Sequence, residues 1–174
     1  MPRSFDMSAD YEGSVEEVHR VFREEDYWVA RLAGSGVDIA TLESLKVGGE
    51  SGVDDTIKVT TLQTVLSRNL PAVVTQLHRG DLCIRREESW SAVSDGVATA
   101  AVTGVILHAP VNLTGTATLC PIGDSGGSRL TVRVTIHVRV PIIGGKVERF
   151  IGSHLAELVA AEQRFTTSWI TDNA

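Results

Sequence analysis

The sequence predicts an α+β fold in which a curved antiparallel sheet wraps around one long C-terminal helix. Residues 129–140 alternate apolar and polar side chains, which is typical of an antiparallel strand with one buried and one wet face. Residues 146–170 instead repeat apolar side chains every three or four positions, which indicates a helix. Such a helix is roughly 40 Å long, and the sheet is the only partner surface of that length that the sequence offers.

The segments before residue 129 follow from the same two periodicities. Residues 4–11 alternate and predict a first strand, which Gly13 ends. Ser14 is a suitable N-cap for a short helix that ends near Phe22, and a second short helix is expected over 25–32. Further strands, rich in Val, Ile and Thr and separated by Gly, Pro and Asp, are expected at 37–47, 56–66, 81–93, 97–108 and 111–120, with one or two helical turns over 71–78.

Composition and charge limit the classes of function. The length of 174 residues predicts one domain, 1–174, and 43% hydrophobic with 22% charged residues are the proportions of an ordinary globular chain. The net charge is −6, and no lysine or arginine cluster stands out along the chain. Nucleic acid and an anionic membrane surface are therefore not expected as partners. The sequence indicates no protein partner.

Neither a membrane-spanning segment nor secretion is expected. Residues 1–10 lack the apolar run of a signal peptide, and no apolar stretch approaches the roughly 20 residues that span a bilayer. A cytoplasmic location follows as the expectation. Cys83 and Cys120 lack metal-ligand spacing and are expected to be buried free thiols, and no metal or organic cofactor is indicated.

A local match surrounds the start of the C-terminal helix. Residues 140–148 are Val-Pro-Ile-Ile-Gly-Gly-Lys-Val-Glu, and the match continues through Leu158 and Glu162 to Trp169. Together with Glu88-Ser89-Trp90, this stretch resembles an uncharacterised bacterial family within the START-like, polyketide-cyclase-like (SRPBCC) superfamily. The order of elements along nearly the whole chain is also similar to the helix-grip fold of that superfamily. The resemblance implies an apolar cavity between sheet and helix, and no assigned reaction.

Small residues give independent support for a cavity. Strands within residues 97–118 are rich in Ala, Gly and Thr, which leave volume facing a thick helix unless larger Leu and Val side chains fill it. The leading hypothesis is binding or carriage of a small hydrophobic ligand, such as a lipid, isoprenoid or polyketide-like compound. The alternative is a cyclase- or dehydratase-type enzyme that acts on an apolar substrate in the same cavity. A third class is a protein-interaction module.

Polar residues on otherwise apolar faces are the candidates for contact with a ligand. His154 and Glu162 fall on the apolar stripe of the last helix, where they either reach solvent at its edge or line a pocket. Arg86 and Glu88 share one strand face, where they either pair with each other in solvent or form a buried polar cluster. No catalytic residue is assigned, although an acid and a base would have to come from these four. The full candidate set is Arg86, Glu88, Trp90, His154, Leu158, Glu162 and Phe165.

Two motifs carry no function here. Residues 123–127 read Gly-Asp-Ser-Gly-Gly, as around the nucleophile of trypsin-like proteases, but Ser125 lacks the histidine motif and chain length of that fold. Turn formation between two strands explains these residues better. Gly144-Gly145-Lys146 lacks the spacing of a phosphate-binding loop and is expected to form a strand-to-helix corner.

Two further expectations concern burial. His19 and His137 are expected to face solvent. Phe165 and Trp169 lie one turn apart on the helix stripe, and both are expected to be largely buried against strand residues such as Val134 and Ile136.

Overall fold

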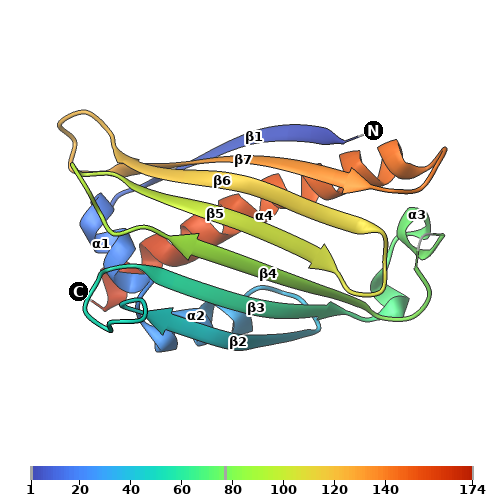
Figure 1. The fold of residues 1–174 in the computed structure, drawn as a ribbon, viewed down its shortest axis with the longest axis horizontal. Helices are drawn as coiled ribbons and strands as arrows, with labels where there is room; N and C mark the ends of the chain where they lie inside the picture. Colours follow the sequence, from blue (N-terminus) through green and yellow to red (C-terminus); the bar gives the residue numbers. More distant parts are fainter. Residues whose placement is uncertain (1, 77, 174) are drawn as a thin grey trace.

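A seven-stranded antiparallel sheet curves around one long helix in the computed structural model, which describes residues 2–76 and 78–173. The elements are β1 (Arg3–Tyr11), α1 (Val15–Val21), α2 (Glu25–Ala33), β2 (Ile39–Val47), β3 (Ile57–Val65), the 3-10 turn η1 (Ser67–Asn69), α3 (Ala72–Thr75), β4 (Leu82–Trp90), β5 (Ala98–Ile106), β6 (Val111–Pro121), β7 (Ser128–Val138) and α4 (Gly144–Asp172). The strand order is β1-β7-β6-β5-β4-β3-β2, and α4 runs across one face of the sheet (Figure 1). The predicted fold class is confirmed.

Strand register brings particular side chains together on the concave face, the face that α4 covers. On β7, every second residue from Val132 to Val138 is buried, as the alternation predicted. Arg86 of β4 lies opposite Thr61 of β3 on one side and Gly104 of β5 on the other. Because side chains alternate along a strand, Arg86 shares its face with Ile84 and Glu88.

Two short helices close one end of the sheet. The α1 helix begins with a capping box, in which the Ser14 side chain and Glu17 each satisfy a backbone N–H of the other. The α2 helix buries one face, formed by Tyr27, Trp28, Arg31 and Leu32. The rings of Tyr27 and Trp28 belong to an aromatic core, and their centroids lie 5.3 Å apart.

The long helix is tied to the sheet at its start by a buried carboxylate. Glu148 Oε2 accepts a hydrogen bond of 3.0 Å from the backbone N–H of Val138, at the end of β7. Arg3 of β1 lies 3.7 Å from the other carboxylate oxygen. A second apolar cluster surrounds this junction, formed by Val111, Ile136, Val138 and Val147.

Two expectations on burial need correction. His19 is buried rather than solvent-facing, because α1 packs on the end of β4 and its ring Nε2 lies 2.9 Å from the Ser91 carbonyl oxygen. Phe165 and Trp169 are only half-buried, and each packs its ring against Tyr27 of α2, with centroids 5.9 Å apart. The short helices therefore occupy the surface that the sequence assigned to the strands.

Other expectations hold within the part of the chain that the structure describes. Cys83 and Cys120 are free thiols, although half-buried rather than fully buried. The Gly-Asp-Ser-Gly-Gly segment is a turn between β6 and β7, in which the Ser125 hydroxyl donates to the Ile122 carbonyl. Across residues 2–76 and 78–173, no helix combines the length and apolar character needed to cross a membrane.

Candidate functional site

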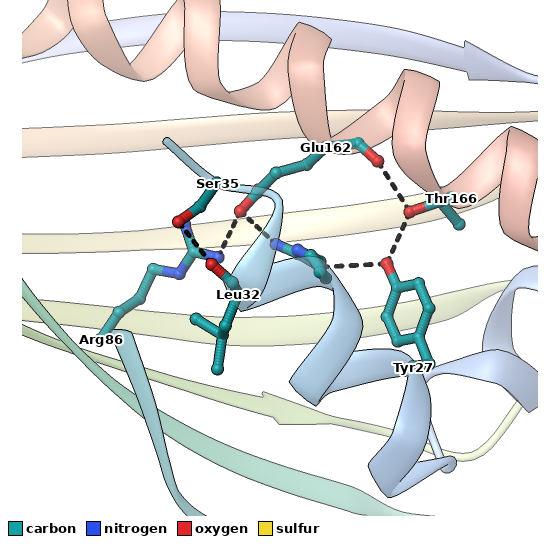
Figure 2. Close-up of polar contacts among 7 residues, drawn as sticks. Tyr27, Leu32, Ser35, Arg86, Glu162 and Thr166 are labelled. Carbon is teal, nitrogen blue, oxygen red and sulfur yellow. Dashed lines mark hydrogen bonds and ion pairs between the residues drawn. The ribbon is translucent and has the colours of Figure 1, made fainter. Parts of the chain in front are cut away.

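Three charged side chains from three different elements meet between α2, α4 and the sheet. Glu162 of α4 accepts a hydrogen bond of 2.7 Å from Arg86 Nη2 of β4 on its Oε2 atom. The same oxygen forms an ion pair with Arg31 Nη2 of α2. Figure 2 shows the Arg86 and Glu162 side chains pointing toward one another across the space between sheet and helix. Arg31, Arg86 and Glu162 are called the arginine–glutamate cluster below.

The cluster continues into a chain of hydroxyl groups. Thr166 Oγ1 donates to the Glu162 carbonyl oxygen at 2.7 Å, so its proton is already used. The Tyr27 hydroxyl, 2.5 Å from Thr166 Oγ1, must therefore donate to it and can accept from Arg31 Nη1 at 3.2 Å. Arg31 also stacks over the Trp28 ring, 4.5 Å from its centroid. Contacts with Glu162, Tyr27 and Trp28 therefore hold the guanidinium of Arg31 in place.

The three charged side chains of the arginine–glutamate cluster are largely buried, so their charges interact strongly. The side chains of Arg31, Arg86 and Glu162 are 8%, 15% and 18% exposed. Burial alone would raise the pKa of Glu162, but the charges and hydrogen bonds of the two arginines outweigh it and lower the pKa to about 2. For Arg31, burial opposes the charge, yet Glu162 raises its pKa above the ordinary value. All three groups are therefore ionised at neutral pH.

Acid should weaken the fold through Glu162. The folded pKa of about 2 lies below the ordinary 4.5, so the unfolded chain takes up this proton first as the pH falls. The stabilisation is complete above pH 4.5 and is lost as the pH approaches 2. We expect this group to contribute a loss of about 3 kcal/mol over that window, measured by urea unfolding at several pH values. A Glu162→Gln variant should lack this contribution, and an identical pH dependence in both proteins would contradict the assignment.

A small hollow lies beside the cluster. Its volume is about 50 Å³, and its lining mixes apolar and polar side chains. The lining residues are Trp28, Arg31, Leu32, Gly34, Ser35, Gln63, Arg86, Leu158, Ala161, Glu162 and Phe165. A volume of this size suits one or two water molecules, whereas sites for drug-sized ligands measure roughly 300–1,000 Å³. The described form is thus closed at this site.

Three buried polar atoms on the concave face of the sheet lack a hydrogen-bond partner among the described residues. They are Arg86 Nε, Thr61 Oγ1 and Trp90 Nε1. Their side chains share the concave face, since Thr61 is the register partner of Arg86 and Trp90 lies four residues further along β4. Two of the atoms can only donate, and the hydroxyl can donate as well. The concave face therefore presents hydrogen-bond donors that have no acceptor among the described residues.

The candidate residues from the sequence separate into two groups. Arg86 and Glu162 meet in the cluster, and Leu158 and Phe165 line the hollow. Glu88 is half-buried near Arg86, whose pKa its charge raises, yet the ion pair of Arg86 is with Glu162 rather than Glu88. Of the two arrangements open to Arg86 and Glu88, a pair in solvent is not observed; Arg86 instead belongs to a largely buried polar cluster with Glu162.

The remaining two candidates lie elsewhere. Trp90 is buried in the aromatic core, with its ring 5.3 Å from that of Phe22. His154 is exposed and stacks on Phe150 at 4.1 Å, outside the lining of the hollow. Of the two places open to His154, the solvent edge of the stripe is the one observed. It therefore supplies no polar group to the cluster.

Sequence analysis missed Arg31, Tyr27 and Thr166. The signal for Arg31 was present, because it lies four residues after Tyr27 and three after Trp28, on the apolar face of α2. The same signal, a charge on an apolar stripe, had identified Glu162. What the sequence could not supply was the contact between α2, β4 and α4 that makes one cluster of them.

A curved antiparallel sheet closed by a long C-terminal helix defines the START-like, helix-grip fold. The chain belongs to the family described as "Protein of unknown function (DUF2505)", whose model matches residues 6–170. Uncharacterised proteins of Mycobacterium tuberculosis H37Rv and Mycobacterium bovis are each 68% identical over 173 residues, covering 99% of both chains. The resemblance inferred from the sequence is confirmed.

Solved structures support the same fold. A protein from Thermus thermophilus matches with a TM-score of 0.61 and 14% identity, covering 99% of each chain. The Zhui aromatase/cyclase from Streptomyces sp. R1128 matches at 0.56 and 10% identity, over 98% of this chain and 94% of that one. A START superfamily protein from Mycobacterium smegmatis matches at 0.54 and 9% identity, over 98% and 99%. At these identities the similarity shows the fold alone.

Proposed function

We propose that the protein binds a small hydrophobic molecule with an oxygen acceptor at one end, in the space between α4, α2 and the sheet. A lipid, isoprenoid or polyketide-like compound has this chemistry. The observation that supports it most directly is the unpartnered Arg86 Nε, buried on the concave face beside the apolar side chains of Leu158 and Phe165. Both the carrier function and the ligand class are parts of this proposal.

The chemistry of the lining selects the polar end of the ligand. Arg86 Nε cannot accept a hydrogen bond, so a carboxylate, carbonyl or phenol oxygen complements it and an amine does not. A buried donor without an acceptor costs about 1–3 kcal/mol. A ligand oxygen that accepts from Arg86 Nε would recover part of that free energy, while the apolar body of the ligand replaces contacts among Leu158, Phe165 and Trp28.

The size of the hollow sets a condition on binding. At about 50 Å³ it is too small for a lipid, so the ligand enters only when α2 and α4 separate. Separation breaks the ion pair between Arg31 and Glu162, which joins these two helices. The arginine–glutamate cluster therefore holds α2 and α4 together in the closed form.

Acid–base catalysis receives less support from the same residues. Glu162 is held by two guanidinium groups with a pKa of about 2, so it is a weak base and has no proton to donate at neutral pH. Arginine does not release its proton in proteins. Binding rather than a cyclase or dehydratase reaction is therefore the function that these side chains favour.

Titration with sodium laurate, below its micellar concentration, tests the proposal. Laurate should change the tryptophan fluorescence, because Trp28 lines the hollow, and should raise the melting temperature. Arg86→Met should weaken laurate binding by about tenfold or more, since it removes charged donors from the oxygen site. Arg85→Met is the matched control, because Arg85 is exposed on the opposite strand face and pairs with Glu43.

Two results would contradict the proposal. In the first, laurate leaves the fluorescence and the melting temperature unchanged, and native mass spectrometry of protein purified without detergent shows no species that organic extraction removes. In the second, Arg86→Met and Arg85→Met weaken laurate binding equally.

A further inference from the structure

The turn between β7 and α4 presents one apolar side chain to solvent in an unusual backbone conformation. Ile142 is 99% exposed and has a φ of 72°. Left-handed backbone is rare for β-branched residues, which clash there with their own main chain. A glycine or asparagine would suit this position better. An apolar residue kept both strained and fully exposed indicates a contact outside the molecule.

Positive charge surrounds this turn. Arg139, Lys146 and Arg149 are exposed, and none of the ion pairs among residues 2–76 and 78–173 includes them. The single acidic residue within 139–149 is Glu148, which is completely buried. Unpaired basic side chains therefore flank the exposed isoleucine on both sides of the turn.

The fold adds two further contributions. Arg3 comes from β1, and although its Nε lies 3.7 Å from the Glu148 carboxylate, its guanidinium also lies 3.5 Å from the point where a Cβ on Gly145 would be. The α4 helix starts at Gly144 with no acidic residue in its first turn, so the partial positive charge of its N-terminus is not neutralised. We call the surface formed by Arg3, Arg139, Ile142, Lys146 and Arg149 the basic end. No such cluster stands out along the sequence, because these residues come from β1, the β7–α4 turn and α4.

The opposite end of the molecule is acidic. Figure 1 shows α1 and α2 at the end of the sheet away from the β7–α4 turn. At that end five exposed or half-buried acidic residues outnumber the two exposed arginines, Arg20 and Arg23; the acidic residues are Glu16, Glu17, Glu24, Glu25 and Asp26. The net charge of −6 therefore conceals a charge separation along the long axis, which would orient the protein at a charged surface.

We propose that the basic end docks on the surface of an anionic phospholipid bilayer, with Ile142 inserted among the headgroups. A bilayer provides both features that the basic end requires, namely negative charge for Arg139, Lys146 and Arg149 and an apolar interior for the isoleucine. Nucleic acid or an acidic protein segment would complement the charges but leave Ile142 in water. This inference concerns an interaction surface and does not depend on the nature of a bound ligand.

Sedimentation with lipid vesicles tests the docking. The protein should bind vesicles of equal parts phosphatidylcholine and phosphatidylglycerol at low salt, and bind vesicles of phosphatidylcholine alone far more weakly. Each removed cation should lower binding about fivefold, so a triple variant at Arg139, Lys146 and Arg149 to glutamine should lose about a hundredfold. Ile142→Asp should lose about tenfold.

The matched control is Val53→Asp. Val53 is also an exposed apolar loop residue, at 85%, but it lies in the β2–β3 connection, where Asp55 pairs with Arg23 near α1. Its replacement should leave vesicle binding unchanged. A second variant, Ile142→Gly, should raise the melting temperature by relieving the left-handed backbone while it weakens vesicle binding. A loss of binding through unfolding would lower both quantities.

Several outcomes would overturn the inference. Equal binding to both kinds of vesicle, or no binding to either at low salt, would remove the anionic bilayer as partner. Unchanged vesicle binding by Ile142→Asp, with a large loss in the glutamine variant, would assign the basic end to polyanions in general. A loss of binding in Val53→Asp as large as in Ile142→Asp would show that the effect follows added negative charge rather than position.

Discussion

Replacing Glu162 by alanine should lower the free energy of unfolding by about 3–5 kcal/mol. The change leaves two largely buried guanidinium groups, Arg31 and Arg86, without the carboxylate that both of them bind. The two positive charges then lie close together in a poorly solvated space. The free-energy cost of these uncompensated charges exceeds the free energy that the contacts of the carboxylate contribute. Urea unfolding at neutral pH, followed by tryptophan fluorescence, measures the loss.

An exposed ion pair provides the control for this variant. Glu87 pairs with Lys58 at 3.3 Å, with both side chains substantially exposed, so Glu87→Ala should cost under about 1 kcal/mol. Glu162→Gln should fall between the two, because its amide oxygen still accepts while the charge is lost. If Glu162→Ala unfolds at the same urea concentration as Glu87→Ala, the cluster contributes nothing to stability and cannot hold α2 and α4 together in the closed form.

The sheet and the long helix could be predicted because their patterns are local. Every second residue of β7 is apolar, and the α4 stripe repeats at helical spacing, so each element indicates its own type and its buried face. The helix nevertheless begins at Gly144 rather than near residue 146, since glycine gave no positive helix signal. Element boundaries depend on tertiary contacts, here the bond between Glu148 and Val138, which no local pattern contains.

The site was predictable only in part, for a related reason. A charge on an apolar face marks a residue that needs a partner, and that principle identified both Arg86 and Glu162. It could not identify the partner, because Glu88 is near Arg86 in sequence whereas Glu162 approaches it from α4. Partners across elements depend on how α4 lies over the sheet. The same limit explains the burial of His19, which depends on where α1 packs against Ser91.

Small residues on the concave face gave a misleading estimate of free volume. A Cβ on Gly115 would overlap the Arg133 carbonyl oxygen and Val134, so this glycine serves the close approach of β6 to β7. Ala100 and Ala117 are buried within the main core, against which Leu155 and Phe165 pack. The volume that these alanines and glycines leave is thus largely filled by neighbouring elements, and the hollow beside the arginine–glutamate cluster is about 50 Å³.

Trp28→Ala should be as damaging as the loss of Glu162, at about 3–5 kcal/mol. Trp28 is completely buried, and its Nε1 donates to the Phe22 carbonyl oxygen at 2.8 Å. Its ring packs against Phe22 and Tyr27 and lies beneath the Arg31 guanidinium, so truncation opens a cavity under the arginine–glutamate cluster. The cavity adjoins the existing hollow, and folded Trp28→Ala protein should therefore bind an apolar dye more tightly than the wild type does.

Trp169→Ala separates this effect from the general loss of a tryptophan. Trp169 is half-buried near the end of α4, with a 3.3 Å hydrogen bond from its Nε1 to exposed Glu24, so its truncation should cost roughly half as much. Urea midpoints of the two variants and their dye affinities are the measurements. If both variants lose equal stability and only Trp169→Ala gains dye affinity, Trp28 does not form the floor of the hollow. The entry of a ligand would then have to be sought near the C-terminal end of α4.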